Sequence, residues 1–149
     1  MEPEPLPFDP VEMARLAARA ACDGLRRRYH RFRPARFYGG IATADCVVCP
    51  LRCSFCWSRC QVEHPEAHGA FYSPEQVAAR LVSIARRHGF QQMRVSGNEP
   101  TLSREHLLAL LDLIPKDYGF VLETNGILIG ADPTYAGALA RYPNLHVRV

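Results

Sequence analysis

The sequence predicts an α/β protein, a partial (β/α) barrel that follows an N-terminal helix and stops after about four parallel strands. From Phe37 onward, short apolar runs alternate with helical patterns, which is typical of repeated β-α-β units around a parallel sheet. The expected strand ends Ser96, Glu123 and Val149 are 27 and 26 positions apart, a spacing that suits one strand-loop-helix unit of a barrel. We expect residues 1–36 to form a lead-in and helix, and residues 37–149 to form an incomplete barrel core.

The N-terminal region shows no chemistry of its own. Its first ten residues contain four prolines and predict a loose lead-in, and the alanine- and arginine-rich stretch from Val11 to about Tyr29 predicts an amphipathic helix. The first strand is expected within residues 37–48, where it leads directly into a loop rich in cysteine.

The later elements follow from caps and apolar patterns. Ser73-Pro74-Glu75-Gln76 predicts a capping box and a proline in the first turn of a helix that ends at Gly89. The remaining expected elements are strand 92–96, helix 103–114, strand 118–123, a helix from Asp132-Pro133 to about Tyr142, and strand 145–149.

Three unusual loops follow the first three expected strands. They contain the cysteines at 49–56, Gly97-Asn98-Glu99-Pro100, and Glu123-Thr124-Asn125-Gly126. Because right-handed crossovers place successive parallel strands side by side, the loops that leave their carboxyl ends gather on one rim. We therefore expect these loops to surround a common site.

Composition limits the function classes. The chain has 48% hydrophobic residues and a net charge of +3, as expected for one globular domain, and it contains no apolar run long enough for a membrane span. The acidic, proline-rich start is unlike a secretory signal, so we expect a cytoplasmic protein. Six arginines between Arg26 and Arg36 either form a solvated helix end, which we favour, or contact phosphates.

The cysteine loop is the strongest functional signal. Five of the six cysteines fall between Cys46 and Cys60, which favours a metal centre over disulfides. The Cys49-x3-Cys53-x2-Cys56 spacing suits an iron–sulfur cubane with three protein thiolates and one open iron. A zinc knuckle made of two Cys-x2-Cys pairs is the alternative, but only three residues separate the pairs here, whereas zinc sites usually have about 15 to 20.

Other candidate ligands carry less weight. Cys46 lies inside the expected strand and is interpreted as a core residue. Cys60, His64 and His68 are spaced by four and could form a second metal site on one helical face, although a proline and a glycine nearby favour a mobile loop. Taken alone, the turn at 97–100 is ordinary, yet Gly97 would permit close backbone approach and Glu99 offers an acceptor for an amine.

Together, the cysteine spacing, the aromatic Phe55 before the last cysteine and the turn at 97–100 resemble the radical S-adenosylmethionine (radical SAM) enzymes. The resemblance implies a 4Fe–4S cluster on Cys49, Cys53 and Cys56, with S-adenosylmethionine chelating the fourth iron. It also implies reductive cleavage to methionine and a 5′-deoxyadenosyl radical that abstracts hydrogen from substrate, with an electron donor such as flavodoxin or ferredoxin. The implied cofactor-binding residues are Phe55 at the adenine, Gly97, Asn98, Glu99 and Pro100 at the methionine moiety, with Glu99 holding the amino group, and Glu123 and Asn125 on the third-strand turn.

The chain differs from this family in two respects. Asn98 stands where the family more often has a second glycine, and we expect the turn to survive because asparagine tolerates left-handed backbone angles. Four strands cannot close a barrel of six or more, so we expect an N-terminal half of a longer enzyme that turns over poorly alone.

Two features of the sequence point to different substrate classes. The Glu123-Thr124-Asn125-Gly126 turn is similar to that of glycyl-radical activating enzymes, whereas Phe55-Cys56-Trp57 resembles tRNA wybutosine-synthesis enzymes, for which the arginines would suit RNA. The rival interpretation is a non-catalytic zinc or iron–sulfur binding module that docks on RNA or a protein partner.

Overall fold

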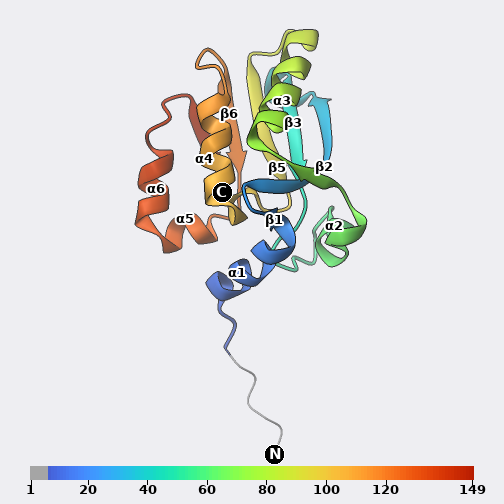
Figure 1. The fold of residues 1–149 in the computed structure, drawn as a ribbon, viewed down its shortest axis with the longest axis vertical. Helices are drawn as coiled ribbons and strands as arrows, with labels where there is room; N and C mark the ends of the chain where they lie inside the picture. The colour runs from blue at the N-terminus through green and yellow to red at the C-terminus, as the bar shows by residue number, and fades with distance from the viewer. Residues whose placement is uncertain (1–6) are drawn as a thin grey trace, which may run out of the picture.

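The structure, a computed structural model, describes residues 7–149 and contains one seven-stranded sheet with helices against it (Figure 1). Residues 1–6, part of the expected lead-in, lie outside the described residues. The helices are α1 (Pro10–Ala21), α2 (Arg59–Glu63), α3 (Pro74–His88), α4 (Arg104–Leu113), α5 (Ile127–Ala131) and α6 (Pro133–Leu139), with 3-10 turns η1 (Phe37–Gly39), η2 (Pro65–Ala67) and η3 (Pro100–Leu102). The strands are β1 (Cys22–Asp23), β2 (Arg26–Ala35), β3 (Ile41–Cys46), β4 (Ala70–Tyr72), β5 (Gln92–Gly97), β6 (Gly119–Glu123) and β7 (Leu145–Arg148).

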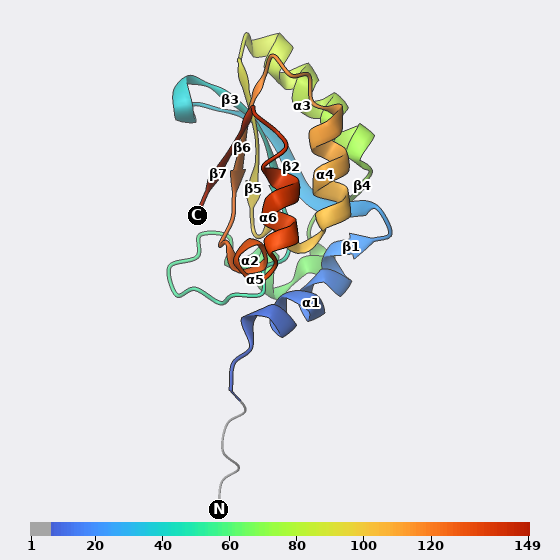
Figure 2. The same ribbon diagram turned by 90° about the vertical axis from the view of Figure 1, so that its left-hand side faces the viewer.

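The parallel half of the sheet confirms the predicted fold class. The strands β3, β5, β6 and β7 pair in that order, and every pairing among them is parallel. In Figure 2, α3, α4 and α6 lie on one face of the sheet, and no helix of the described residues covers the other face. The result is a curled partial (β/α) barrel with a covered outer face and an open inner face.

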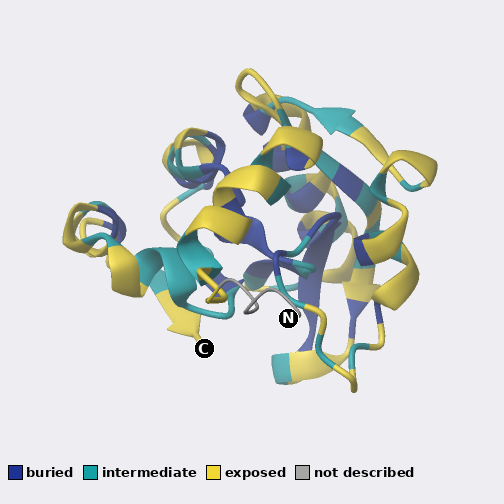
Figure 3. Cartoon of the chain, turned by 90° about the horizontal axis from the view of Figure 1, so that it is seen from below, coloured by how far each residue is buried: buried dark blue, intermediate teal, exposed yellow. Residues whose placement is uncertain are grey.

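The core lies between the sheet and these helices. Alternate strand residues face the helices because successive side chains of a strand point to opposite faces. Ala44, Val95 and Leu122 are fully buried there together with Leu81 of α3 and Leu110 of α4. Figure 3 shows the buried residues concentrated on the strands and on the helix faces turned toward them.

Helix α3 begins and ends as its sequence predicts. The Ser73 side chain accepts from the Gln76 amide and the Gln76 side chain accepts from the Ser73 amide, which completes the capping box. Gly89 ends the helix with a left-handed φ of 68°, a conformation that glycine adopts without strain.

The prediction of one helix from Val11 to about Tyr29 is wrong beyond Ala21. Helix α1 ends at Ala21, and a tight turn with Gly24 at φ +57° connects β1 to β2, which runs antiparallel beside β3. Alanine and arginine favour helix locally, but their propensities are worth only tenths of a kcal/mol per residue, and pairing with β3 outweighs them.

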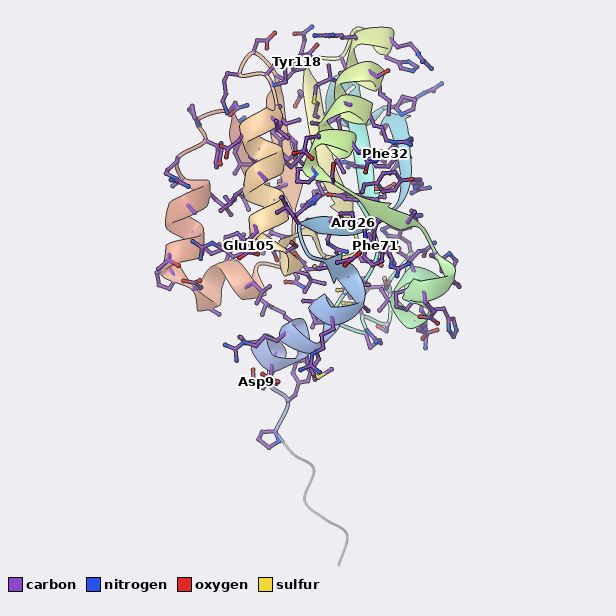
Figure 4. The ribbon with its side chains drawn as sticks, in the orientation of Figure 1. Asp9, Arg26, Phe32, Phe71, Glu105 and Tyr118 are labelled. Atoms are coloured by element: carbon purple, nitrogen blue, oxygen red, sulfur yellow. The ribbon has the colours of Figure 1, made fainter. Side chains whose placement is uncertain are left out.

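The arginines of β2 therefore do not form the expected solvated helix end. Arg27 is fully buried, while Arg26 and Arg28 lie over the ring of Phe71 on β4; Figure 4 labels Arg26 and Phe71. A bulge between Tyr29 and Arg31 shifts the register of β2 against β3. The cluster is thus divided among separate environments and is not one basic face.

Helix α1 packs beneath the loops that leave the parallel strands. Ala14 and Ala21 form a small apolar cluster with Val47 and Val48, which precede the cysteine loop, and with Leu102. The division into residues 1–36 and 37–149 stays a prediction, although β2 shares the sheet with β3. Within residues 7–149, every helix is too short or too polar to cross a lipid bilayer.

Candidate functional site

The loops that follow β3, β5 and β6 meet at one end of the sheet, as the topology predicts. The Asn98 amide donates to the Cys46 carbonyl at 3.2 Å, and the Glu99 amide donates to the Val48 carbonyl at 3.0 Å. From the third loop, the Asn125 side-chain amide lies 4.0 Å from the Cys49 sulfur. Three segments far apart in the sequence thus share one rim.

The cysteine loop presents three half-buried thiols. Cys49, Cys53 and Cys56 are intermediate in exposure, and the Cys56 amide closes a turn on the Cys53 carbonyl at 3.1 Å. A cavity of about 200 Å³ opens between this loop and α2, lined by Cys53 and Cys56. Burial raises the pKa of the Cys49 thiol to about 11, so this thiol keeps its proton in the metal-free chain. Binding of a metal must displace that proton.

The described residues contain no preformed site for a single metal ion. Among residues 7–149, no three His, Cys, Asp or Glu side chains lie together in a way that could hold a single metal ion. In a cubane each thiolate binds a different iron, so its ligands are spaced more widely than those of a single ion. Three thiols on one short loop, two of them lining the same cavity, suit this wider arrangement.

The other cysteines and histidines fall outside this set. Cys46 is fully buried on β3, as expected for a core residue, and burial raises its pKa to about 12. The expected mobile loop around Cys60, His64 and His68 instead contains α2 and the 3-10 turn η2, and Cys60 is exposed. His64 caps the carboxyl end of α2, and Pro65 starts the 3-10 turn that separates His68 from this helix.

Asn98 ties together the two ends of the cysteine loop. Its side-chain oxygen accepts from the Val48 amide at 2.8 Å, and its side-chain nitrogen donates to the Ser58 hydroxyl at 2.8 Å. Val48 and Ser58 flank residues 49–57, so one carboxamide fixes both ends of the loop. Val48 sits at φ +84°, an unusual conformation for a β-branched residue.

The expectation that the turn survives because Asn98 adopts a left-handed backbone conformation is therefore wrong. Among residues 7–149, the non-glycine residues at positive φ are Tyr38 and Val48, so Asn98 is not left-handed. The turn at 97–100 is held by the Asn98 side chain and by Gly97, which adopts φ +101°. A Cβ on Gly97 would lie 2.6 Å from the Cys46 amide nitrogen, so the close approach that glycine permits here is to β3.

Glu99 links the β5 and β6 loops from the interior. Its carboxylate is 1% exposed and accepts from the Thr101 amide and hydroxyl at 3.1 and 2.7 Å. The Thr124 hydroxyl and the Asn125 amide, at 2.5 and 2.8 Å, complete four donors to its two oxygens. Three of these bonds fall on Oε1 and one on Oε2, and together they set the spacing of the two loops.

Arg27 connects three segments of the site, a role that the sequence did not predict. Its guanidinium donates to the carbonyls of Ala21, Val47 and Glu99 at 3.2, 2.7 and 2.9 Å, and so joins α1, the end of β3 and the β5 loop. Nothing in the sequence separates Arg27 from its neighbouring arginines, because only the strand register turns it inward.

Glu123 is hydrogen-bonded within the site, whereas Phe55 is exposed to solvent. Burial alone would raise the pKa of the Glu123 carboxyl, but hydrogen bonds from Ser96 and Tyr38 and the charge of Arg94 outweigh it and lower that pKa. Phe55 projects from the cysteine loop with 87% of its surface exposed. The roles expected for both at the cofactor stay predictions.

A partial barrel of parallel strands with a three-cysteine loop at its carboxyl rim defines the class of protein. Residues 45–149 match the Radical SAM superfamily, and the chain belongs to that superfamily of enzymes. Two curated relatives are the GTP 3′,8-cyclase of Syntrophomonas wolfei subsp. wolfei, 36% identical over 85 residues, and the probable GTP 3′,8-cyclase of Thermoplasma volcanium, 29% identical over 88 residues. The matches cover 56% of this chain but only 26% and 24% of the relatives, so the chain spans about a quarter of their length.

Proposed function

We propose that this chain binds a 4Fe–4S cluster through Cys49, Cys53 and Cys56 and uses S-adenosylmethionine as its co-substrate. The observation that carries the proposal is the position of these thiols: one loop, anchored at both ends by Asn98, on the rim where the β5 and β6 loops also lie. The superfamily match supports the same assignment.

The protein itself would hold and orient the cluster and its co-substrate. When bound, the cluster and its co-substrate would supply reductive cleavage of a sulfonium and hydrogen abstraction from substrate, driven by a donor such as flavodoxin or ferredoxin. Gly97, Asn98 and Pro100 would border the methionine moiety, while the backbone of Phe55 would border the adenine.

Glu99, Glu123 and Asn125 would act from the neighbouring loops. The Oε1 atom of Glu99 already accepts three hydrogen bonds, whereas Oε2 accepts one, so an amino group would be accepted by Oε2. Asn125 lies nearest the cluster ligands through its contact with Cys49. We assign Asn125 to the cofactor, and Glu123 to the border between cofactor and substrate.

The names of the relatives make GTP the first substrate to test. Both matches cover only part of this chain, so we propose radical chemistry with S-adenosylmethionine as its activity, and GTP cyclisation is the first specific reaction to test.

Anaerobic reconstitution of the chain with iron and sulfide tests the cluster assignment. We expect about four iron and four sulfide per chain and a reduced electron paramagnetic resonance signal that changes when S-adenosylmethionine is added. Cys49→Ala, Cys53→Ala and Cys56→Ala should each lose most of the cluster, while Cys60→Ala, an exposed thiol of the same segment, should retain it.

The rival binding module predicts different results. Stoichiometric zinc without iron or sulfide after anaerobic purification would refute the cluster assignment. A cluster whose resonance signal does not respond to S-adenosylmethionine would refute the co-substrate assignment and leave an iron–sulfur binding module.

A further inference from the structure

The open inner face of the sheet carries a polar pocket beside the cysteine loop. Its volume is about 440 Å³, within the range of small-molecule sites. Its lining residues are Arg31, Arg33, Phe37, Trp57, Arg94, Ser96 and Glu123. Trp57 directly follows Cys56, so the pocket adjoins the proposed cluster loop.

Strand β2 gives the pocket an excess positive charge. Beyond its bulge, Arg31 and Arg33 both bind one oxygen of the same carboxylate, Asp45 of β3, at 2.5 and 2.8 Å. The Asp45 side chain is fully buried, whereas 42% of the Arg31 side chain and 27% of the Arg33 side chain remain exposed. One carboxylate cannot neutralise two guanidinium groups, and the remaining N–H donors of both face an accessible space.

The opposite wall is electrically balanced. Arg94 of β5 pairs with Glu123 of β6 at 3.1 Å, and Ser96 donates to the other Glu123 oxygen at 2.6 Å. Arg94 is almost fully buried and donates to Glu123 and to the Thr43 hydroxyl. The unbalanced charge of the pocket therefore lies on the β2 side.

Two aromatic rings are exposed at this pocket. Phe37 and Trp57 expose 59% and 66% of their surfaces, which is unusual for side chains of this size. The Arg31 guanidinium lies 5.4 Å from the centroid of the Trp57 ring, and that of Arg94 lies 5.2 Å from the Phe37 ring. These contacts place flat apolar surfaces beside the charged donors.

We propose that this pocket is the substrate site and that it takes a small ligand with an anionic group and a planar ring. The anionic group pairs with Arg31 and Arg33, since the planar guanidinium group can donate two parallel hydrogen bonds to either a phosphate or a carboxylate. The ring stacks on Trp57 or Phe37. The assignment as substrate rests on the proposed function, because Trp57 places the pocket next to the cluster loop.

Trp57 also reports binding, because it is the single tryptophan of the chain. The cluster-free chain is titrated with guanosine 5′-monophosphate and with 4-hydroxybenzoate, which combine a ring with a phosphate or a carboxylate. Guanosine lacks the anion, and inorganic phosphate lacks the ring. At least one of the two combined probes should quench Trp57 saturably, with guanosine and phosphate each binding about tenfold more weakly or less.

The two combined probes distinguish the sources of the anion. Tighter binding of the nucleotide identifies a phosphate-bearing substrate, and tighter binding of 4-hydroxybenzoate identifies a carboxylate. The proposal is overturned if neither probe binds, or if guanosine binds as tightly as its monophosphate.

Variants locate the site. Arg33→Gln leaves Arg31 to pair with Asp45 and should weaken binding of the better probe about tenfold. Arg87→Gln removes an exposed charge from α3, on the helix-covered face, and should leave binding unchanged. Phe37→Ala should also weaken binding of the better probe. Because the Phe37 ring is largely exposed, this variant replaces Arg33→Gln in the test if Arg33→Gln fails to fold. Equal binding by all three variants and the parent chain overturns the assignment.

This titration needs neither cluster nor S-adenosylmethionine. Probe binding in a chain that assembles no cluster would defeat the proposed function, and with it the assignment of the ligand as substrate, but it would leave the pocket as a ligand site. A chain that assembles the cluster and responds to S-adenosylmethionine, but binds neither probe, would defeat only the pocket assignment.

Discussion

Replacing Asn98 by alanine tests whether one carboxamide holds the cysteine loop. The change removes two hydrogen bonds of 2.8 Å and leaves the buried Val48 amide unpaired, while the Ser58 hydroxyl keeps its bond to Gln61. Each lost bond is worth about 1 kcal/mol net, and a buried group left unpaired costs about 1–3 kcal/mol. Val48 can then relax from φ +84°, which offsets part of this loss. We expect Asn98→Ala to lower the free energy of unfolding by about 2–4 kcal/mol.

Urea denaturation followed by circular dichroism measures the loss, and hydrogen exchange of the Val48 amide locates it. Asn98→Asp is the matched control, because a carboxylate still accepts from Val48 and can accept from the Ser58 hydroxyl, so most of the stability and the Val48 protection should remain. The reconstituted Asn98→Ala chain should also lose its cluster faster than the parent. An unfolding free energy within about 0.5 kcal/mol of the parent, with unchanged hydrogen exchange of the Val48 amide, would refute the role of Asn98 in anchoring the cysteine loop.

Three further changes test the interior of the site. Glu99→Gln replaces an acceptor by an amide donor that faces other donors, so we expect a loss of about 2–3 kcal/mol in urea denaturation, against almost none for the exposed Glu105→Gln. Arg27→Met removes donors to the carbonyls of Ala21, Val47 and Glu99 and should cost more than about 3 kcal/mol; a loss below about 1 kcal/mol would contradict its role. His106 is buried between the Tyr29 hydroxyl and the Leu25 carbonyl, and burial lowers its pKa to about 4. The unfolded chain therefore takes up this proton first as the pH falls below 6.5, so stability drops by about 3 kcal/mol between pH 6.5 and 4, and His106→Gln should flatten that part of the stability–pH curve.

Local signals in the sequence were sufficient for the parallel half of the fold. The capping box at Ser73, the stop at Gly89 and the spacing between strand ends are short-range features, and the structure confirms each of them. The three loops on one rim follow from strand order and the handedness of crossovers, which need no knowledge of side-chain contacts.

The antiparallel half was missed because its signals are not local. Residues 22–35 are rich in helix-favouring arginine, and they form strands because β3 and β4 offer backbone partners. The bulge in β2 then decides which arginines face the pocket and which face the core. A sequence pattern with one regular period cannot show such a change of face.

By itself, the sequence determined the family, the partial barrel and the three clustered cysteines, because these depend on spacing along the chain. Only the tertiary structure decided that Asn98 anchors the cysteine loop, that Glu99 and Arg27 are buried connectors, and that two arginines share Asp45 beside an exposed tryptophan. Those roles arise from hydrogen-bond geometry and burial between residues far apart in the chain, which are fixed only when the strands pair and the loops meet.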